Sequence, residues 1–569
     1  MTRPVVRRVV AQAATLLMTV LVTALLTLTI ATPAGSEPSE GVPGVPRADQ
    51  SSLSISSYSL GCALVSNGTV RCWGVNWHGQ LAQGNEDDIG DDPGESTVAV
   101  PLPRPAVSIS AGHEHACAIL DTGELRCWGA NGSGQLGQGN TDDVGDDPGE
   151  STVRVDFGPG VTTSEVAVGA YSTCALLSTG VVRCMGSSAL GQMAQGNNDD
   201  VGGQPAPAPR TVAVPLPRPA VQIAAAYSSY CAVLDTGQLY CWGRGNSGEL
   251  MQGNNGEVGD DAGEVPVLVK TGGRAVLAIA GGGNNFCAIH SDRRLRCWGA
   301  SQYGQLGLGR SDAFGDGTGE TEVGEVPLPT GRTVTAVTVG DTHVCAVLDT
   351  GELRCWGESQ GLGQGNTQAV GDQPGESTVT VDVGGPVRAV AAGKGVTCAV
   401  TDTGLRCWGS NFFGSLARGN EVDYGTKPGE LPRLLPPISL GGLTVGRDTD
   451  GDGVRDAVDA CPSVAGPLAN GCVAPPEAVL KGKKVLLDTV LAKKKASAKC
   501  PAKAEVTVKT KSKAGRIKVT KQLKTKTVAT GCLVKGKVRL PAKPKKSAKV
   551  KVSVSGKKLT TKRLIAVRP

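Results

Sequence analysis

The chain has few aromatic residues and few histidines, and it lacks a phosphate loop and the helical motif of a zinc protease. Phenylalanine, tryptophan and tyrosine together make up 3% of its 569 residues, and there are five histidines. The absence of a long amphipathic helical pattern leaves little room for an α/β enzyme. No phosphate loop occurs, and His113-Glu-His115 lacks the helical spacing of a zinc protease. We therefore expect a protein that is not an enzyme, and an enzyme with site residues remote in sequence is the alternative.

Glycine, proline and cysteine are abundant instead, with 80, 34 and 18 residues. This composition is typical of a turn-rich all-β chain. Most cysteines recur in pairs along residues 62–407, and the first cysteines of successive pairs are 53–58 residues apart. Such self-similarity predicts repeated units that bury their faces against their neighbours. The pairs are Cys62 and Cys72, Cys117 and Cys127, Cys174 and Cys184, Cys231 and Cys241, Cys287 and Cys297, Cys345 and Cys355, and Cys398 and Cys407.

Each pair fits across an antiparallel hairpin. In the second copy, the register that joins Cys117 to Cys127 leaves the three-residue loop 121–123, with glycine at the position that needs a left-handed backbone. Counting outward from this loop puts the cysteines at a non-hydrogen-bonded pair, where α-carbons lie about 4.5 Å apart, within reach of a disulfide. The seventh pair has one residue fewer between its cysteines, so its turn must differ.

Disulfides are favoured over zinc, because two cysteines ten residues apart do not match the short C-x-x-C spacing of structural zinc sites. We predict that all 18 cysteines form disulfides, and disulfides persist outside the reducing cytosol. The four cysteines beyond the repeated pairs are Cys461, Cys472, Cys500 and Cys532.

The N-terminus predicts export. Three arginines precede an apolar stretch at residues 9–30, and small residues follow it. We expect residues 1–34 to be a signal peptide and residues 35–50 a linker. The protein is then secreted or lies on the extracellular side of the cell envelope. An uncleaved membrane anchor is the alternative, because the apolar stretch is nearly long enough to span a bilayer.

The repeats predict a ring of blades. A whole unit spans residues 105–150 and contains an alternating strand, the cysteine hairpin, a Gly-Gln-Leu turn and an acidic loop. Several short strands per copy suit a propeller blade, and seven copies suit a closed ring. Partial strands at 53–57 and 438–445 flank the set and could close it. We therefore predict a seven-bladed β-propeller over residues 51–447.

These units resemble the repeats of the regulator of chromosome condensation family. The family pattern of His-x-Cys-Ala-Leu, Trp-Gly, Asn and Gly-Gln-Leu-Gly appears here as His115-Ala-Cys-Ala-Ile, as Cys127-Trp-Gly-Ala-Asn-Gly-Ser-Gly-Gln-Leu-Gly and as His343-Val-Cys-Ala-Val. The copies depart from it at Met185, which replaces the tryptophan, and at the fifth turn, residues 291–293. The resemblance implies a seven-bladed propeller that serves as a protein-binding platform. Known members include a nuclear exchange factor, whose partner an exported chain cannot reach, and a secreted bacterial inhibitor of β-lactamases.

Six tryptophans recur at one position of the blade, where a large ring most simply fills the space between neighbouring blades. A ligand cage is the alternative. These residues are Trp73, Trp128, Trp242, Trp298, Trp356 and Trp408.

The segment that precedes the first cysteine of each pair differs from copy to copy. Equivalent positions in a ring lie on one rim, and exposed aromatic and polar side chains there suit protein recognition. Neutral variation of loop tips is the alternative. The partner-binding residues that we predict are His113, His115, Tyr171, Tyr227, Tyr230, Asn284, Phe286 and His343.

Residues 448–461, DTDGDGVRDAVDAC, resemble a thrombospondin type-three calcium repeat. Acidic residues alternate at its start, glycine allows a sharp turn, and an aspartate stands in the twelfth position, where a calcium loop closes. We predict Ca²⁺ binding by a module at residues 448–475, and an acidic linker turn is the alternative. The acidic loops between blades are expected to be solvated connectors rather than calcium sites. The predicted ligands are Asp448, Asp450, Asp452, Val454, Asp456 and Asp459.

The C-terminal segment is strongly basic. Residues 477–569 contain 29 lysines and arginines against three acidic residues, a net charge of 29 − 3 = +26, whereas the rest has 28 against 49, a net charge of −21. Valine alternates with lysine or threonine, which predicts strands with one apolar and one basic face. We expect a Lys-rich immunoglobulin-like β-sandwich at residues 476–569, joined by Cys500 and Cys532. Its lysines either attract anionic envelope polymers or are merely solvated.

The sequence thus predicts an all-β protein that consists of a propeller, a short calcium-binding loop module and a C-terminal β-sandwich. We expect a monomeric, exported, non-catalytic scaffold or adaptor that binds an unidentified extracellular protein and no nucleic acid. A freely secreted inhibitor of an extracellular enzyme is the alternative.

Overall fold

The computed structural model describes residues 52–205, 210–320, 322–376, 378–442 and 445, and the backbone of seven strands between residues 479 and 567. The predicted signal peptide, linker and calcium module lie outside these residues, as do the side chains of Cys461, Cys472, Cys500 and Cys532. Within the described part of the chain, no helix has the length and apolar character needed to cross a membrane.

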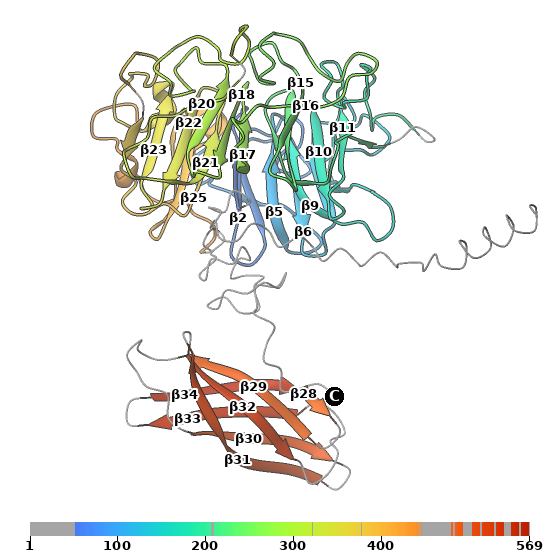
Figure 1. Cartoon of the computed structure of the whole chain (residues 1–569), viewed down its shortest axis with the longest axis vertical. Helices are drawn as coiled ribbons and strands as arrows, with labels where there is room; N and C mark the ends of the chain where they lie inside the picture. Colours follow the sequence, from blue (N-terminus) through green and yellow to red (C-terminus); the bar gives the residue numbers. More distant parts are fainter. Residues whose placement is uncertain are drawn as a thin grey trace, which may run out of the picture. The chain divides into compact units, whose positions relative to one another are not determined.

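Seven antiparallel sheets follow one another along residues 53–409 as the blades of a propeller (Figure 1). Six blades have four strands in sequence order and the seventh has three. Blades 1 and 2 contain β1 (Leu53–Ile55), β2 (Leu60–Leu64), β3 (Val70–Gly74), β4 (Val98–Ala99), β5 (Ala106–Ala111), β6 (His115–Leu120), β7 (Leu125–Gly129) and β8 (Val153–Arg154). Blades 3 and 4 contain β9 (Thr163–Val168), β10 (Ser172–Leu177), β11 (Val182–Gly186), β12 (Val212–Ala213), β13 (Ala220–Ala225), β14 (Ser229–Leu234), β15 (Leu239–Gly243) and β16 (Val267–Leu268).

Blades 5 to 7 repeat this order, with three short 3₁₀ helices in their loops. Blades 5 and 6 contain β17 (Val276–Gly282), β18 (Asn285–His290), β19 (Leu295–Gly299), β20 (Gly324–Glu325), β21 (Val334–Val339), β22 (His343–Leu348), β23 (Leu353–Gly357) and β24 (Val379–Val381). Blade 7 contains β25 (Ala389–Ala392), β26 (Val396–Thr401) and β27 (Gly404–Gly409), and the helices are η1 (Ser359–Leu362), η2 (Phe412–Gly414) and η3 (Pro432–Leu434). The predicted seven-bladed, all-β architecture is confirmed.

The cysteine hairpins have the predicted register. In blade 2, Cys117 pairs with Cys127 across β6 and β7, and the amide of Leu120 donates to the carbonyl of Glu124 at 2.9 Å to close the loop. Gly123 has φ 78°, the left-handed conformation that the loop requires. All seven predicted pairs of the propeller are disulfides, with α-carbons 4.0–4.1 Å apart. In the seventh, the pairing of Thr401 with Gly404 leaves a shorter turn, as expected.

The repeated tryptophans connect neighbouring blades. All six are fully buried, and each indole N–H donates to a backbone carbonyl in the preceding blade's loop, as Trp128 does to Gln80 at 2.7 Å. The predicted packing role is confirmed. In blade 3, where Met185 lacks a donor, the hydroxyl of Thr173 donates to the equivalent carbonyl, that of Gln135, at 3.0 Å.

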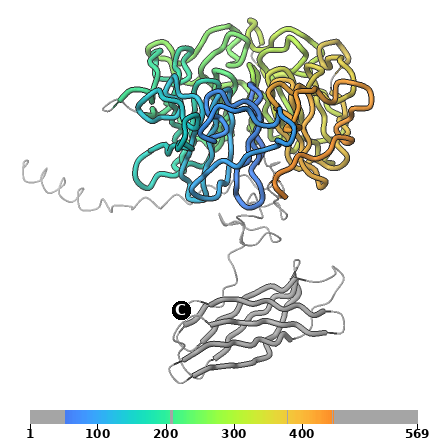
Figure 2. Tube along the Cα trace, turned by 180° about the vertical axis from the view of Figure 1, so that it is seen from behind, coloured from blue at the N-terminus to red at the C-terminus, as the bar shows by residue number. Residues whose placement is uncertain are grey.

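The same contact closes the ring, because Trp73 of blade 1 donates to the carbonyl of Ser415 in blade 7 at 2.8 Å. Figure 2 shows the first and last blades, blue and orange, side by side. The predicted closing strand at 438–445 is only partly formed. The amide of Ile438 donates to the carbonyl of Leu405, and Val445 forms an isolated bridge with Val65.

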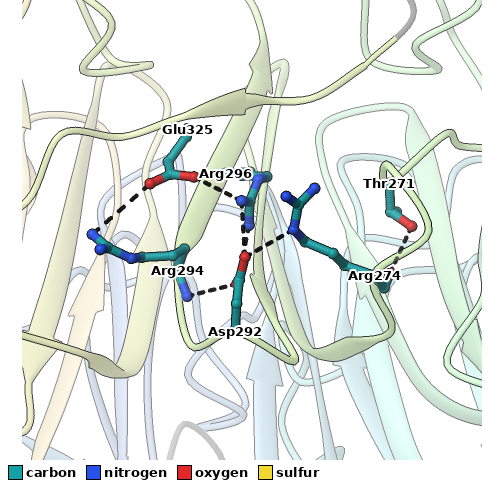
Figure 3. Close-up of polar contacts among 6 residues, drawn as sticks. All are labelled: Thr271, Arg274, Asp292, Arg294, Arg296 and Glu325. Atoms are coloured by element: carbon teal, nitrogen blue, oxygen red, sulfur yellow. Dashed lines mark hydrogen bonds and ion pairs between the residues drawn. The ribbon is translucent and has the colours of Figure 1, made fainter.

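The hairpin tip of blade 5 departs from the other blades (Figure 3). Arg293 occupies the left-handed position, with φ 58°, where blade 2 has glycine. The side chain of Arg296 is 6% exposed and forms ion pairs with Asp292 at 3.0 Å and with Glu325 at 2.7 Å. Arg274 also contacts Asp292, at 3.0 Å. The charges of this tip are therefore engaged mainly with one another.

The C-terminal segment forms a separate, antiparallel seven-stranded sheet in the order β28-β29-β32-β31-β30-β33-β34. The predicted strands are present, and β31 pairs first with β30 and then, over its last residues, with β32. The strands are β28 (Val479–Lys481), β29 (Lys484–Ala492), β30 (Lys503–Ser512), β31 (Gly515–Val528), β32 (Gly531–Arg539), β33 (Ala548–Gly556) and β34 (Leu559–Val567).

Candidate protein-binding rim

The inner strands of the blades surround a central channel with a volume of about 760 Å³. Its polar side chains satisfy backbone groups on the edges of these strands. The Ser54 hydroxyl accepts from the amide of Ala111 at 2.9 Å, and the Glu165 carboxylate accepts from the amide of Ile223 at 3.0 Å. Because an unpaired strand edge exposes backbone donors that need partners, these side chains have a structural role in the channel.

At one end of the channel, the turns that follow the inner strands pack against one another. A side chain at Gly112 would place its β-carbon 2.1 Å from the carbonyl oxygen of Gly169, so glycine is required there. The amide of Ala170 donates to the carbonyl of Tyr227 at 2.9 Å, linking adjacent turns. The turns leave a cavity of about 60 Å³, and its lining includes His113. This end of the channel therefore displays the turn side chains on a nearly closed surface.

An arc of seven rings crosses this surface from blade 7 through blade 1 to blade 4. Successive ring centres are 4.5–6.1 Å apart, in the range of aromatic pairs. The turns of blades 1 to 4 supply four of the rings, and the loops after β3 and β27 supply the others. We call this set the aromatic arc, and its members in order are Phe412, Phe413, Trp77, Tyr58, His113, Tyr227 and Tyr171.

The arc is partly exposed, which is unusual for a chain with so few aromatic residues. Phe412 is 65% exposed, Trp77 43% and Tyr171 37%, whereas the other six tryptophans are fully buried. A cluster of large rings open to solvent is the kind of surface that supplies the anchor residues of protein interfaces. The arc is therefore the strongest candidate for a binding site among the described residues.

Carboxylates lie along the arc. Glu114 Oε1 is 3.5 Å from His113 Nδ1, and this neighbour holds the pKa of Glu114 below its ordinary value. Burial raises the pKa of Asp341, which lines the same small cavity as Tyr227. Burial also raises the pKa of Tyr227, and the nearby carboxylates of Glu114 and Asp341 add to this shift. These carboxylates make the electrostatic potential around the rings negative.

A second group of carboxylates lies beside Trp77. Burial raises the pKa of Asp88, and the charges of Asp91 and Glu421 raise it further, while the Asn76 amide and the Trp77 side chain oppose the shift. The amide of Asn76 donates to the Asp88 carboxylate at 2.7 Å, which fixes this carboxylate in the loop.

Four of the eight predicted partner-binding residues lie in the turns of the rim. His113, Tyr171 and Tyr227 belong to the arc. Asn284 is half-buried in the turn of blade 5, next to the turn of blade 4 that contains Tyr227, and accepts a hydrogen bond from Arg244 at 3.3 Å. It does not belong to the arc.

The other four predicted residues are fully buried, so the prediction that they face the rim is wrong. They are His115, Tyr230, Phe286 and His343. The turn in blade 2 is tighter than expected, because the amide of Gly112 donates to the carbonyl of His115 at 2.9 Å and only two residues lie between. The strand therefore begins at His115, whose Nε2 lies 2.7 Å from the hydroxyl of Thr173 in the next blade. Tyr230 contacts the preceding blade instead, with its hydroxyl 2.8 Å from that of Ser172.

Four rings of the arc are not among the residues predicted from the sequence to bind a partner. They are Tyr58, Trp77, Phe412 and Phe413. The signal for Trp77 was available, because it is the one tryptophan outside the repeated blade position. Phe412 and Phe413 occupy the place of Gly132 and Ser133 in blade 2, so they too depart from the repeat.

The acidic loops have a structural role. Asp143 accepts from the amide of Asn131 at 2.7 Å, and Glu150 accepts from the amide of Gly145 at 3.1 Å. Among the described residues, no group of three or more histidine, cysteine, aspartate or glutamate side chains is placed to hold a metal ion. These carboxylates are therefore used to shape the connectors between blades.

Comparison with known proteins agrees with this architecture. A family model described as the RCC1-like domain matches residues 91–445. The ultraviolet-B receptor UVR8 of Arabidopsis thaliana is 26% identical over 387 residues, which cover 67% of this chain and 81% of the receptor. The secretion-regulating guanine nucleotide exchange factor of Mus musculus is 26% identical over 407 residues, which cover 66% of this chain and 80% of that factor.

Solved structures give the same fold. The structure of Prp20p from Saccharomyces cerevisiae has a TM-score of 0.52 and 20% identity, covering 66% of this chain and 86% of that chain. Human WBSCR16 has a TM-score of 0.52 and 18% identity, covering 64% and 94%. At these identities, the likeness concerns the fold alone.

Proposed function

The chain belongs to the RCC1-like domain family, and we propose that it is a non-catalytic scaffold that binds another protein through the aromatic arc. One observation carries the proposal: in a chain with 3% phenylalanine, tryptophan and tyrosine, six of these side chains and the imidazole of His113 gather at one end of a propeller. Trp77, the most polarisable of them, is 43% exposed while every other tryptophan is buried. Relatives named as a receptor and as an exchange factor are in keeping with a role in binding and regulation.

The arc can be tested with a matched pair of variants. Tyr171 in the arc and Tyr303 in the loop after β19 are both 37% exposed, so their replacement by alanine removes the same exposed surface. Partner capture by the full chain, with chemical cross-linking, should fail for Tyr171→Ala combined with Trp77→Ala and persist for Tyr303→Ala. Equal capture by both variants would show that the arc is not the binding site.

Export is part of the proposal. The support is the N-terminal sequence together with the seven disulfides of the propeller, which suit an oxidising compartment. Sequencing the N-terminus of the protein recovered outside the cytoplasm tests this directly. A mature chain that begins just after residue 34 is expected, and an intact chain retained in the cytoplasm would contradict export.

We also propose that residues 448–475 bind calcium through the aspartates of the thrombospondin-like loop. The support is the alternation of acidic residues with a glycine at the turn. Titration calorimetry of the full chain should show calcium binding that Asp450→Asn combined with Asp452→Asn abolishes. Unchanged heat in this variant would assign the calcium to another site.

The basic C-terminal segment is proposed to fold as a β-sandwich that holds the protein at an anionic envelope polymer. Its net charge of 29 − 3 = +26 over residues 477–569 supports electrostatic attraction. Retention on isolated envelopes should then fall as the salt concentration rises, because salt screens exposed charges. Retention that is indifferent to salt would argue against this mechanism.

A further inference from the structure

The aromatic arc contains more negative charge than the described side chains around it neutralise. Asp88, Asp341 and Glu421 have no ion-pair partner within 4 Å among the described residues. Lys394 lowers the pKa of Asp341 but acts on it at longer range, without a direct ion pair. Asp88 and Asp341 are half-buried, whereas Glu421 is exposed. An uncompensated carboxylate in a half-buried place costs free energy, and an incoming cation would recover part of it.

The rings supply the second half of a cation site. Tyr171 and Tyr227 are arranged edge to face, with centres 6.1 Å apart and hydroxyls 3.4 Å apart, beside Glu114. Trp77 packs against Phe413 at 4.8 Å, beside Asp88. Aromatic faces attract ammonium and guanidinium groups, and a neighbouring carboxylate adds a direct ion pair.

One cation at this rim, Arg244, is already engaged. Arg244, in the loop after β15, donates to Asn246 and to Asn284, and its Nε lies 3.9 Å from the buried carboxylate of Glu249. It is therefore held away from the carboxylates of the arc. Lys394 acts on Asp341 only at longer range, so a cationic ligand would add the direct ion pair that these carboxylates lack.

Resting on the function proposed above, we propose that the aromatic arc binds an extended protein segment that carries arginine or lysine side chains. One cationic group is held at Tyr171 and Tyr227 with Glu114 and Asp341. A second is held at Trp77 with Asp88 and Glu421.

The dimensions and the charge of the chain agree with such a ligand. Six steps of 4.5–6.1 Å between ring centres make the arc long enough for several residues of extended chain, at about 3.3 Å per residue. Residues 1–476 have a net charge of 28 − 49 = −21, which would attract a basic segment over long range.

Fluorescence anisotropy with three labelled decapeptides tests this inference on the full chain. The peptides alternate glycine with arginine, with lysine or with glutamate. The arginine and lysine peptides should bind, the glutamate peptide should not, and raising the salt concentration from 50 to 500 mM should weaken binding at least tenfold. Binding of the glutamate peptide, or of a neutral oligosaccharide added as a fourth probe, with equal dependence on the arc would overturn the inference.

Isosteric variants keep the rings and remove the charge. Glu114→Gln combined with Asp341→Asn should weaken binding of the arginine peptide at least tenfold. Asp156→Asn, which changes an exposed aspartate that accepts a hydrogen bond within its own loop, should leave binding unchanged. Equal effects of the two changes would overturn the inference, because they would indicate attraction to the acidic body as a whole.

The outcome also separates this inference from the proposed function. If the captured partner needs Tyr171 and Trp77 but is unaffected by Glu114→Gln with Asp341→Asn, the arc is a binding site and the cationic ligand is wrong. If the arginine peptide binds with full dependence on Glu114 and Asp341, the chemistry of the ligand is supported even before a partner is known.

Discussion

Glu249 is a buried carboxylate at a position where four other blades have glutamine, and its replacement should stabilise the protein in a pH-dependent way. It stands in the Gly-Gln-Leu turn of blade 4. One carboxylate oxygen accepts from the amide of Ser247 at 2.7 Å, and the other has no hydrogen-bond partner. Its side chain is fully buried, and burial raises its pKa from 4.5 to about 7.

The sign and size of the effect follow from this shift. Between pH 4.5 and about 7 the folded protein keeps a proton that the unfolded chain releases, so the free energy of unfolding falls as the pH rises. A shift of this size corresponds to about 3 kcal/mol, at about 1.4 kcal/mol per pH unit. Glu249→Gln should therefore stabilise the protein by up to about 3 kcal/mol above pH 7, or about 4 °C in Tm for a domain of this size. Below pH 4.5 this advantage should vanish.

Guanidinium unfolding at pH 5 and pH 8 measures the difference. The converse variant, Gln192→Glu, provides the control, because Gln192 occupies the equivalent buried position in blade 3 and accepts from the amide of Leu190 at 2.8 Å. It should lose stability at pH 8 and little at pH 5. A gain for Glu249→Gln that is the same at both pH values would refute the reasoning.

Two further predictions concern buried ionisable side chains. Burial lowers the pKa of His115 to about 3 and that of His343 to about 4, so the unfolded chain takes up protons first as the pH falls below 6.5, and stability present above 6.5 is lost. Each histidine should lower the free energy of unfolding by about 3 kcal/mol between pH 6.5 and 4. In the variant with glutamine at both positions, the free energy of unfolding measured in urea should depend less on pH. Asp292→Ala should reduce the free energy of unfolding by about 2 kcal/mol, because it leaves Arg296, with a side chain that is 6% exposed, short of a partner. Thermal unfolding checks this against Asp121→Ala, which removes an ion pair to an arginine that is 55% exposed and should have a much smaller effect.

The repeated parts of the fold were predictable because local geometry determines them. The spacing from Cys117 to Cys127, with Gly123 at the loop, leaves one hairpin register compatible with a disulfide, and the structure has it. The recurring tryptophans predicted packing between blades for the same reason, since a large ring at an equivalent position in every blade needs an equivalent space. The detail that Thr173 satisfies the carbonyl left free by Met185 depends on two blades and could not be seen in either alone.

The rim was harder to predict, for two physical reasons. The turns are tighter than the sequence indicates, so a shift of one or two residues at the start of β6 or β14 moved His115 and Tyr230 from the surface to the core. Every residue of β6 and β14 is buried, so a residue that belongs to either strand, and not to the turn before it, lies in the core. Trp77 and Phe412 lie in irregular loops far apart in the sequence, and the closure of the ring brings them onto one arc.

The accessibility of Trp77 when a partner binds tests the central claim most directly. It is 43% exposed and the other six tryptophans are fully buried, so acrylamide quenching and mild oxidation with N-bromosuccinimide report on this residue selectively in the unmodified protein. Addition of the captured partner, or of the arginine peptide, should protect Trp77 from both reagents in proportion to the bound fraction. A saturated complex in which Trp77 is quenched and oxidised as in the free protein would show that the binding surface lies elsewhere.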